Sequence, residues 1–171
     1  MKDLDGKVAI VTGAGRIGGI GQGAALELAK WGVRIVATDV ARRSADTDWD
    51  GRSTTAEDMT GLHSLVEQVE SVGSQAIALS VDVTNAEDAS GCVEAAVEAF
   101  GQVDILVNNA GVPNGIGNFL KIPDSVWEMS WQVNVMGMVR MSRAVVPVMK
   151  PRGGGSIINN ASVAGIRAMP E

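Results

Sequence analysis

The chain has 171 residues, 46% of them hydrophobic, a length that suits one domain, residues 1–171, with a sizeable core. Its formal net charge of −6 argues against nucleic acid as a ligand, because binding a polyanion needs clustered lysine and arginine. Neither a long apolar run nor a charged leader ending in small residues stands at the N-terminus, so we expect a soluble, cytoplasmic protein with no membrane partner.

The first predicted element is a strand, Lys7–Thr12, that runs straight into a glycine-rich turn, Gly13–Gly21. Glycines in such a turn let the pyrophosphate of a dinucleotide approach backbone N–H groups at the start of a helix. Asp39 stands at the distance expected for a carboxylate that binds the adenosine ribose, which favours NAD over NADP. The alternative is that the glycines form only a flexible loop. The candidate cofactor residues here are Thr12, Gly13, Gly15, Arg16, Gly18, Gly19, Ile20, Gly21 and Asp39.

A helix is expected over Ala24–Lys30, with Gly32 just past its C-terminal end. The next strand, Val33–Asp39, is followed by a polar, acidic stretch from Ala41 to Gly61. This stretch predicts a loop near the adenosine end of the cofactor site. Within it, Trp49 either caps the adenine or makes a packing contact, which is the commoner role.

Three further strands are expected, over Gln75–Val81, Val103–Asn108 and Gly155–Ala161. Helical stripes of apolar residues precede the first two, at 62–69 and 93–100. This alternation of strands with helices is typical of a parallel sheet with crossover helices. The fold class is therefore α/β, a Rossmann-like doubly wound parallel sheet.

Two features concern the later helices. Thr84-x-x-Glu87 predicts a capping box at the start of the helix that contains the second stripe. A further helix is expected to begin near Asp124 or Ser125 and to end at about Met149.

The remaining candidate ligands are few. Cys92 and His63 are the single cysteine and histidine, so no Cys/His metal site can be assembled. We expect Cys92 in the core, and His63 on the surface or in a packing contact. The short cationic pairs, Arg42–Arg43 and Lys150 with Arg152, are expected to be solvated surface.

Two later segments carry a more specific pattern. Asn108-Asn109-Ala110-Gly111 directly follows the predicted fourth strand, and Ser162-Val163-Ala164-Gly165 follows the fifth. With the glycine-rich turn, these ordered motifs resemble the short-chain dehydrogenase/reductase family over nearly the whole chain. The resemblance implies an NAD-dependent oxidoreductase that transfers hydride between nicotinamide and a secondary alcohol or ketone. It also implies a small-molecule substrate and a homo-oligomer.

The resemblance assigns roles to particular residues. Asn108, Asn109, Ala110 and Gly111 would steady the central sheet and border the nicotinamide ribose, and Asp82 with Val83 would hold the adenine. Asn134 would interrupt its helix and support a proton-relay water. Ser162 would hydrogen-bond the reacting oxygen, although a hydroxyl at a strand end often only caps the following turn. Asn134 and Ser162 are thus the candidate catalytic residues.

The chain also departs from the family pattern. Its glycine turn reaches Gly19-Ile20-Gly21 two residues late, which leaves Arg16 free to face solvent or to approach the adenosine phosphate. It contains no tyrosine, and the family's Tyr-x-x-x-Lys would begin just beyond Glu171. We therefore expect a fragment, truncated after the fifth strand and inactive by itself. The alternative is a noncatalytic nucleotide-binding relative, and a sugar-nucleotide epimerase is disfavoured by Asn108–Gly111.

Overall fold

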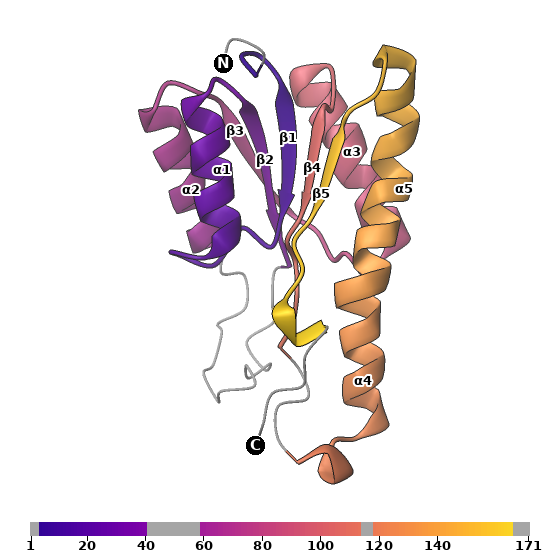
Figure 1. The fold of residues 1–171 in the computed structure, drawn as a ribbon. Coiled ribbons are helices and arrows are strands. Elements are labelled where there is room, and N and C mark those ends of the chain that lie inside the picture. Colours follow the sequence, from indigo (N-terminus) through magenta and orange to yellow (C-terminus); the bar gives the residue numbers. More distant parts are fainter. Residues whose placement is uncertain (1–3, 41–58, 114–117, 166–171) are drawn as a thin grey trace.

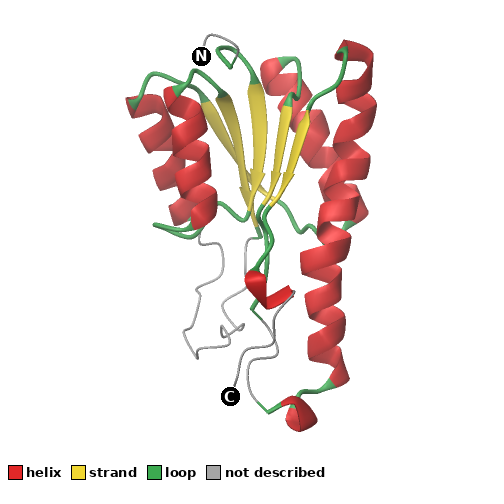
Figure 2. Cartoon of the chain, in the orientation of Figure 1, coloured by secondary structure: helices red, strands yellow, loops and turns green. Residues whose placement is uncertain are grey.

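The structure is a computed structural model and describes residues 4–40, 59–113 and 118–165. Its centre is a parallel sheet in the order β3-β2-β1-β4-β5. The strands are β1 (Val8–Thr12), β2 (Arg34–Asp39), β3 (Ala76–Ser80), β4 (Ile105–Asn108) and β5 (Ser156–Asn159). Figure 2 shows their arrows pointing to the same end of the molecule. The expected α/β, Rossmann-like fold is confirmed.

Helices cover both faces of the sheet (Figure 1). On one face lie α1 (Ile20–Lys30) and α2 (Thr60–Ser71), and on the other lie α3 (Ala86–Phe100) and α5 (Met138–Met149). The alternating side chains of β1 feed two separate cores, because successive residues of a strand point to opposite faces. The α1/α2 core contains Ala9, Val11, Leu62, Leu65 and Val69, and the α3/α5 core contains Val8, Ile10, Val93, Met141 and Val145.

Cys92 lies in the second of these cores, as the sequence predicts, and is 2% exposed. Burial raises the pKa of its thiol to about 12, because the charged thiolate is disfavoured away from water. The thiol therefore stays protonated at neutral pH and acts as a small apolar group. His63 is exposed on α2, in agreement with the expected surface role.

The long helix expected between Asp124 and Met149 is present but is not uniform. It consists of α4 (Asp124–Trp131), a π-helical turn η2 (Gln132–Gly137) and α5. Such a turn inserts an extra residue into the helix and is frequent at functional sites. The resemblance placed Asn134 at a helix interruption, and η2 contains it.

The caps of two helices give opposite outcomes. Gly32 follows α1 with φ +81°, and its N–H donates to Ala29, so the predicted C-terminal glycine is confirmed. The predicted capping box at Thr84 is wrong. Asn85 is the N-cap of α3 and accepts from the N–H groups of Glu87 and Asp88, because the Thr84 hydroxyl instead donates to Asp82 Oδ1.

Several predicted boundaries need correction. The first helix begins at Ile20, four residues before the predicted Ala24, and the other corrections below are of one to two residues. The fourth strand begins at Ile105 rather than Val103, and the Asp104 carboxylate just before it accepts hydrogen bonds from the N–H of Val8 and the ammonium group of Lys7. The fifth ends at Asn159 rather than Ala161, so two residues separate it from Ser162. The predicted loop from Ala41 to Gly61 ends earlier, since α2 begins at Thr60. The expectations for Trp49 and for Arg42–Arg43 lie outside the described residues.

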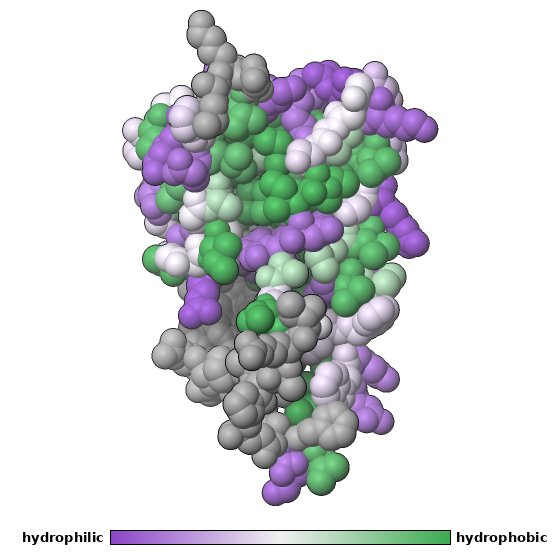
Figure 3. All heavy atoms as spheres, in the orientation of Figure 1, coloured by the Kyte–Doolittle hydropathy of each residue, from purple (hydrophilic) through white to green (hydrophobic). Residues whose placement is uncertain are grey.

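β5 is the edge strand next to β4, and all four of its residues are exposed. Ile157 and Ile158 remain 38% and 48% exposed, although their neighbours in β4 are buried. Figure 3 shows hydrophobic side chains at the surface over the region of β4 and β5. This edge presents an unpaired backbone and uncovered apolar surface.

Candidate functional site

The strand order reverses between β1 and β4, and we call the region beyond the carboxyl ends of these two strands the crevice. The chain moves outward from β1 to β2 and β3, then returns to the other side of β1 for β4 and β5. Ligands of open parallel sheets bind at such a reversal, beyond the carboxyl ends of the strands. The two segments that leave β1 and β4 there are Gly13–Gly21 and Asn109–Gly111.

Two glycines let these segments touch. Gly13 has φ +66°, and a Cβ atom on it would lie 2.7 Å from Cα of Ala110. A Cβ atom on Gly21 would lie 2.5 Å from the Gly13 carbonyl oxygen and 2.7 Å from Nδ2 of Asn109. Both glycines are therefore needed for close packing of the two segments. The sequence alone did not indicate which glycines of the turn have this role.

The outer part of the turn leads into the N-terminus of α1. Gly19 is the N-cap and has no side chain to bind the first amides of the helix. Among the described residues of the first turn of α1, none is acidic. Unpaired N–H groups and the positive end of the helix dipole suit this position to an anion such as a pyrophosphate. Arg16 and Gly18 are exposed in the turn before it.

Asp39 lies at the carboxyl end of β2 beside this turn. Its Oδ2 accepts a hydrogen bond from the Gly15 N–H at 2.7 Å, and its Oδ1 accepts one from the Val40 N–H at 2.8 Å. A Cβ atom on Gly15 would lie 2.9 Å from Oδ2, so glycine is needed for this approach. The carboxylate is half-buried, which leaves part of it accessible to a ribose hydroxyl.

Thr12 and Asn109 tie the two walls of the crevice together. The Thr12 hydroxyl oxygen accepts from the N–H groups of Asn109 and Ala110, both at 3.0 Å. The Asn109 side-chain amide donates to the carbonyls of Thr12 at 3.0 Å and Gly13 at 2.9 Å. Four of the predicted cofactor residues thus form one hydrogen-bonded unit: Thr12, Gly13, Asn109 and Ala110.

Two further asparagines, which the sequence analysis missed, support this unit from β5. The Asn108 amide donates to Oδ1 of Asn159 at 2.8 Å, and the Asn160 amide donates to Oδ1 of Asn109 at 2.9 Å. The residues are neighbours because Asn108 and Asn159 are in register. The available signal was the repetition of an Asn-Asn pair at the ends of two predicted strands.

Asn134 occupies the π-helical turn and reaches the end of the asparagine motif. Its Oδ1 accepts from the N–H of Val112 at 2.8 Å, and its Nδ2 donates to the carbonyl of Val112 at 3.0 Å. Both polar atoms of the side chain are therefore engaged by one backbone unit. This arrangement leaves the backbone of η2 as the part of Asn134 that could support a water.

Ser162 is exposed in the loop after β5, immediately before the short helix η4 (Val163–Gly165). Its carbonyl accepts from the N–H of Gly165 at 3.0 Å. In Figure 1, η4 lies beyond the carboxyl ends of the strands, the same end of the sheet as the crevice. The structure thus places Ser162 at the correct end of the sheet for its predicted role.

Asp82 and Val83 follow β3, beside the strand that ends at Asp39. Oδ1 of Asp82 accepts from the N–H and the hydroxyl of Thr84, at 2.8 and 2.7 Å. Val83 is 7% exposed, and a Cβ atom on Gly137 would lie 2.8 Å from its Cγ2. Their contact with adenine stays a prediction.

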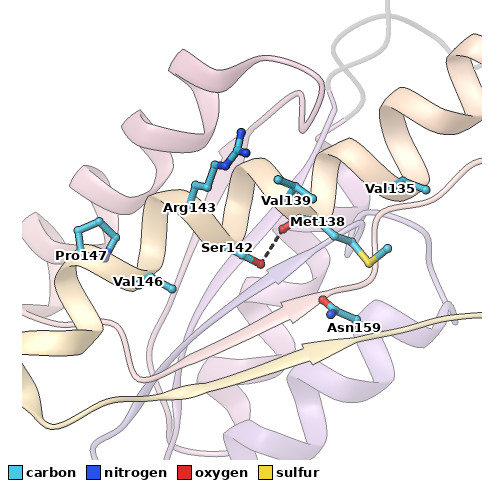
Figure 4. Close-up of a pocket in the computed structure, with 8 residues that line it drawn as sticks. All are labelled: Val135, Met138, Val139, Ser142, Arg143, Val146, Pro147 and Asn159. Atoms are coloured by element: carbon cyan, nitrogen blue, oxygen red, sulfur yellow. Dashed lines mark hydrogen bonds between the residues drawn. The ribbon is translucent and has the colours of Figure 1, made fainter.

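A depression with a volume of about 550 Å³ lies between α5 and β5, and its lining includes Asn159, the partner of Asn108. Figure 4 shows the residues that line it, and the Arg143 side chain points away from Asn159 there. Apolar side chains of α5, including Met138, Val139 and Val146, form most of its wall. The groove is continuous with the uncovered edge at β5.

Within residues 4–40, 59–113 and 118–165, no three His, Cys, Asp or Glu side chains gather in a way that could hold a metal ion. No helix in those segments has the length and apolarity needed to cross a bilayer.

Comparison with known proteins gives consistent matches. The model of a family described as short chain dehydrogenase matches residues 7–171. An uncharacterised NAD-dependent oxidoreductase of Mycobacterium tuberculosis is 40% identical over 169 residues, which are 98% of this chain and 58% of that protein. A protein of Mycolicibacterium smegmatis described as a short-chain type dehydrogenase/reductase is 38% identical over 168 residues, again 98% of this chain and 58% of the relative.

Among solved structures, carveol dehydrogenase from Mycobacterium avium in complex with NAD superposes with a TM-score of 0.84 at 32% identity. The match covers 97% of this chain and 58% of the dehydrogenase. The chain therefore spans somewhat more than half the length of each of these three proteins.

Proposed function

The chain belongs to the short-chain dehydrogenase family, and we propose that it forms the cofactor-binding part of an NAD-dependent oxidoreductase. The reaction would transfer hydride between nicotinamide C4 and a secondary alcohol or ketone carbon. The observation that supports this best is the crevice at the β1/β4 reversal, where Asp39, the glycine turn and the tied Thr12–Asn109 unit meet. The NAD in the matched carveol dehydrogenase supports the choice of cofactor.

The residues of the crevice fit a dinucleotide. The α1 N-terminus and the turn before it would hold the pyrophosphate, and Asp39 would accept hydrogen bonds from the adenosine ribose. Asn109 and its supports would keep the nicotinamide side of the crevice in shape. NAD, when bound, supplies or accepts the hydride.

At the reacting oxygen, the Ser162 hydroxyl would donate a hydrogen bond that strengthens as negative charge develops. Asn134 would support the proton path through the backbone of η2, since its side chain is engaged by Val112. The proton itself would come from the family's Tyr-x-x-x-Lys, which is not among these 171 residues. A small-molecule alcohol or ketone substrate, a single domain over residues 1–171, a homo-oligomer and a cytoplasmic location complete the proposal.

The test compares this chain with an extended protein, defined here as the chain continued through the family's tyrosine helix and remaining strands. The continuation is taken from the gene where the reading frame continues, or otherwise from the Mycobacterium tuberculosis relative. NAD binding and NAD reduction with a panel of secondary alcohols are measured. Binding without turnover across the panel would favour the alternative, a noncatalytic nucleotide-binding protein.

We expect the extended protein to bind NAD more tightly than NADP. The 2′-phosphate of NADP would face the Asp39 carboxylate, and like-charge repulsion there costs about 1 kcal/mol at partial burial. Asp39→Asn removes the charge but keeps an oxygen for the Gly15 N–H, so it is expected to narrow the gap between the two dissociation constants. Asp39→Ala should also narrow this gap, and it additionally removes the hydrogen bond that holds the turn at Gly15.

Isothermal titration of both cofactors into parent and variants checks this preference. Arg16 is the described cation that could neutralise a 2′-phosphate, so Arg16→Gln is the matched control. Tighter NADP binding by the parent, lost in Arg16→Gln, would reverse the assignment.

A further inference from the structure

Gln22 is one of five polar or charged side chains that are buried among the described residues, at 4% exposure. It lies in the first turn of α1, and its two amide atoms face in different directions. Oε1 accepts a hydrogen bond from the Gly18 N–H at 3.0 Å, and Nε2 donates to the Gly61 carbonyl at 3.0 Å. A buried amide with both ends satisfied joins the glycine turn to the start of α2.

At its Gly18 end, this bridge contacts the lengthened part of the glycine turn. The turn is two residues longer than the family pattern, and its outer residues, from Arg16 to Gly18, are exposed. Gly18 has φ +71°, and a Cβ atom on it would meet nothing within 4 Å. Asp39 holds the turn at Gly15, and Gln22 holds it at Gly18. These two contacts bracket the lengthened part.

The Gly61 end extends the bridge to a separate helix. Gly61 is buried, and a Cβ atom on it would overlap the Gly15 carbonyl oxygen. The first turn of α2 therefore rests directly on the glycine turn. The result is one packed cluster that consists of Gln22, Gly18, Gly15 and Gly61.

We propose that Gln22 is a positioning residue that holds the lengthened glycine turn in the shape a dinucleotide pyrophosphate needs, and that it couples this shape to the docking of α2. The inference rests on the proposed NAD site. Loss of the side-chain amide removes the acceptor of the Gly18 N–H and the bond to the Gly61 carbonyl, so the turn samples other shapes and binding of the diphosphate weakens.

The test uses the extended protein with Gln22→Leu, which removes both bonds at similar size, and Gln22→Glu, which keeps only the acceptor for Gly18. Gly61→Ala moves α2 away from the turn while the Gln22 side chain itself is unchanged. Gln68→Leu is the matched control, because the Gln68 amide donates within α2, to the carbonyl of Ser64. Dissociation constants are measured for NAD and ADP by calorimetry and for adenosine by nuclear magnetic resonance, together with the unfolding temperature.

We expect Gln22→Leu and Gly61→Ala to weaken NAD and ADP binding by about tenfold, Gln22→Glu to give a similar loss, and Gln68→Leu to change neither. Adenosine binding should stay within about threefold of the parent, because it lacks the diphosphate that the turn contacts. Equal weakening of adenosine, or NAD binding by Gln22→Leu within about twofold of the parent, would show that Gln22 only stabilises the fold.

A measurement on the parent covers the case in which the variants do not fold. NAD should slow hydrogen exchange at the amides of the glycine turn and also at the first turn of α2. Protection of the turn alone would overturn the coupling while leaving the NAD site intact. Failure of the parent to bind NAD would instead overturn the proposed function and, with it, this role for Gln22.

Discussion

A polypeptide of residues 1–171 is expected to give no detectable NAD reduction with secondary alcohols, whereas the extended protein turns over. Hydride transfer between a carbonyl and an alcohol needs a group that gives or takes the hydroxyl proton. The chain contains no tyrosine, and a positioned acid or base contributes about 10²–10⁴-fold in rate. The family pairs its tyrosine with a lysine because a phenol with pKa about 10 needs a nearby cation to act near neutrality.

The same comparison should show a difference in stability. All four residues of β5 are exposed, and the groove between α5 and β5 is open to solvent. Uncovered apolar surface at a strand edge favours association and lowers the unfolding temperature. Thermal unfolding and light scattering on the two proteins should therefore give a lower midpoint and larger particles for residues 1–171.

Robust turnover by the 171-residue chain would show that another group supplies the proton and that the assignment of the catalytic residues is wrong. A matched control separates chemistry from folding. The extended protein with the motif tyrosine changed to phenylalanine should unfold like its parent, yet lose turnover as completely as the short chain.

The second large effect is expected at Ser162. In the extended protein, Ser162→Ala should lower kcat by about 10²–10³, the usual loss for one donor to a developing oxyanion. The dissociation constant for NAD should stay nearly unchanged, because the predicted dinucleotide contacts lie on the glycine turn and at Asp39. Stopped-flow turnover and calorimetric titration measure the two quantities.

Ser156→Ala is the control for Ser162, since Ser156 is an exposed serine at the opposite end of β5. Its turnover and NAD affinity should match the parent. Turnover by Ser162→Ala within a few-fold of the parent would leave Ser162 as a turn-capping residue before η4, the alternative that its sequence position also allows.

The strands and helices could be predicted well because burial on both faces gives a parallel sheet continuous apolar runs. β1, with all five residues buried, and the stripe that contains Leu62, Leu65 and Val69 show this. The caps were less predictable. Thr84 and Asn85 are both suitable N-caps, and the choice depended on the Asp82 carboxylate, which occupies the Thr84 hydroxyl.

The candidate site likewise contains some residues whose position the sequence predicts and others whose position it does not. Asp39 and Asn109 could be placed beside the glycine turn because each stands at the end of a predicted strand, and their contact with a cofactor stays a prediction. Gln22 and Asn160 could not, because each acts through a partner distant in sequence, Gly61 and Asn109 respectively. An isolated glutamine on a helix has no local pattern that separates a buried bridge from a solvated side chain. The sheet register and the approach of α2 had to be known first.

The bonds between Thr12 and the Asn109–Ala110 segment bear on how a nucleotide could enter and leave. They connect the carboxyl ends of the two central strands, so we expect the inner walls of the crevice to move together. A hinge motion between the two halves of the sheet would break these bonds and leave two N–H groups without an acceptor. Each unpaired N–H group would cost about 1–3 kcal/mol of free energy. We therefore expect exchange of the proposed nucleotide to depend on segments outside the central strands.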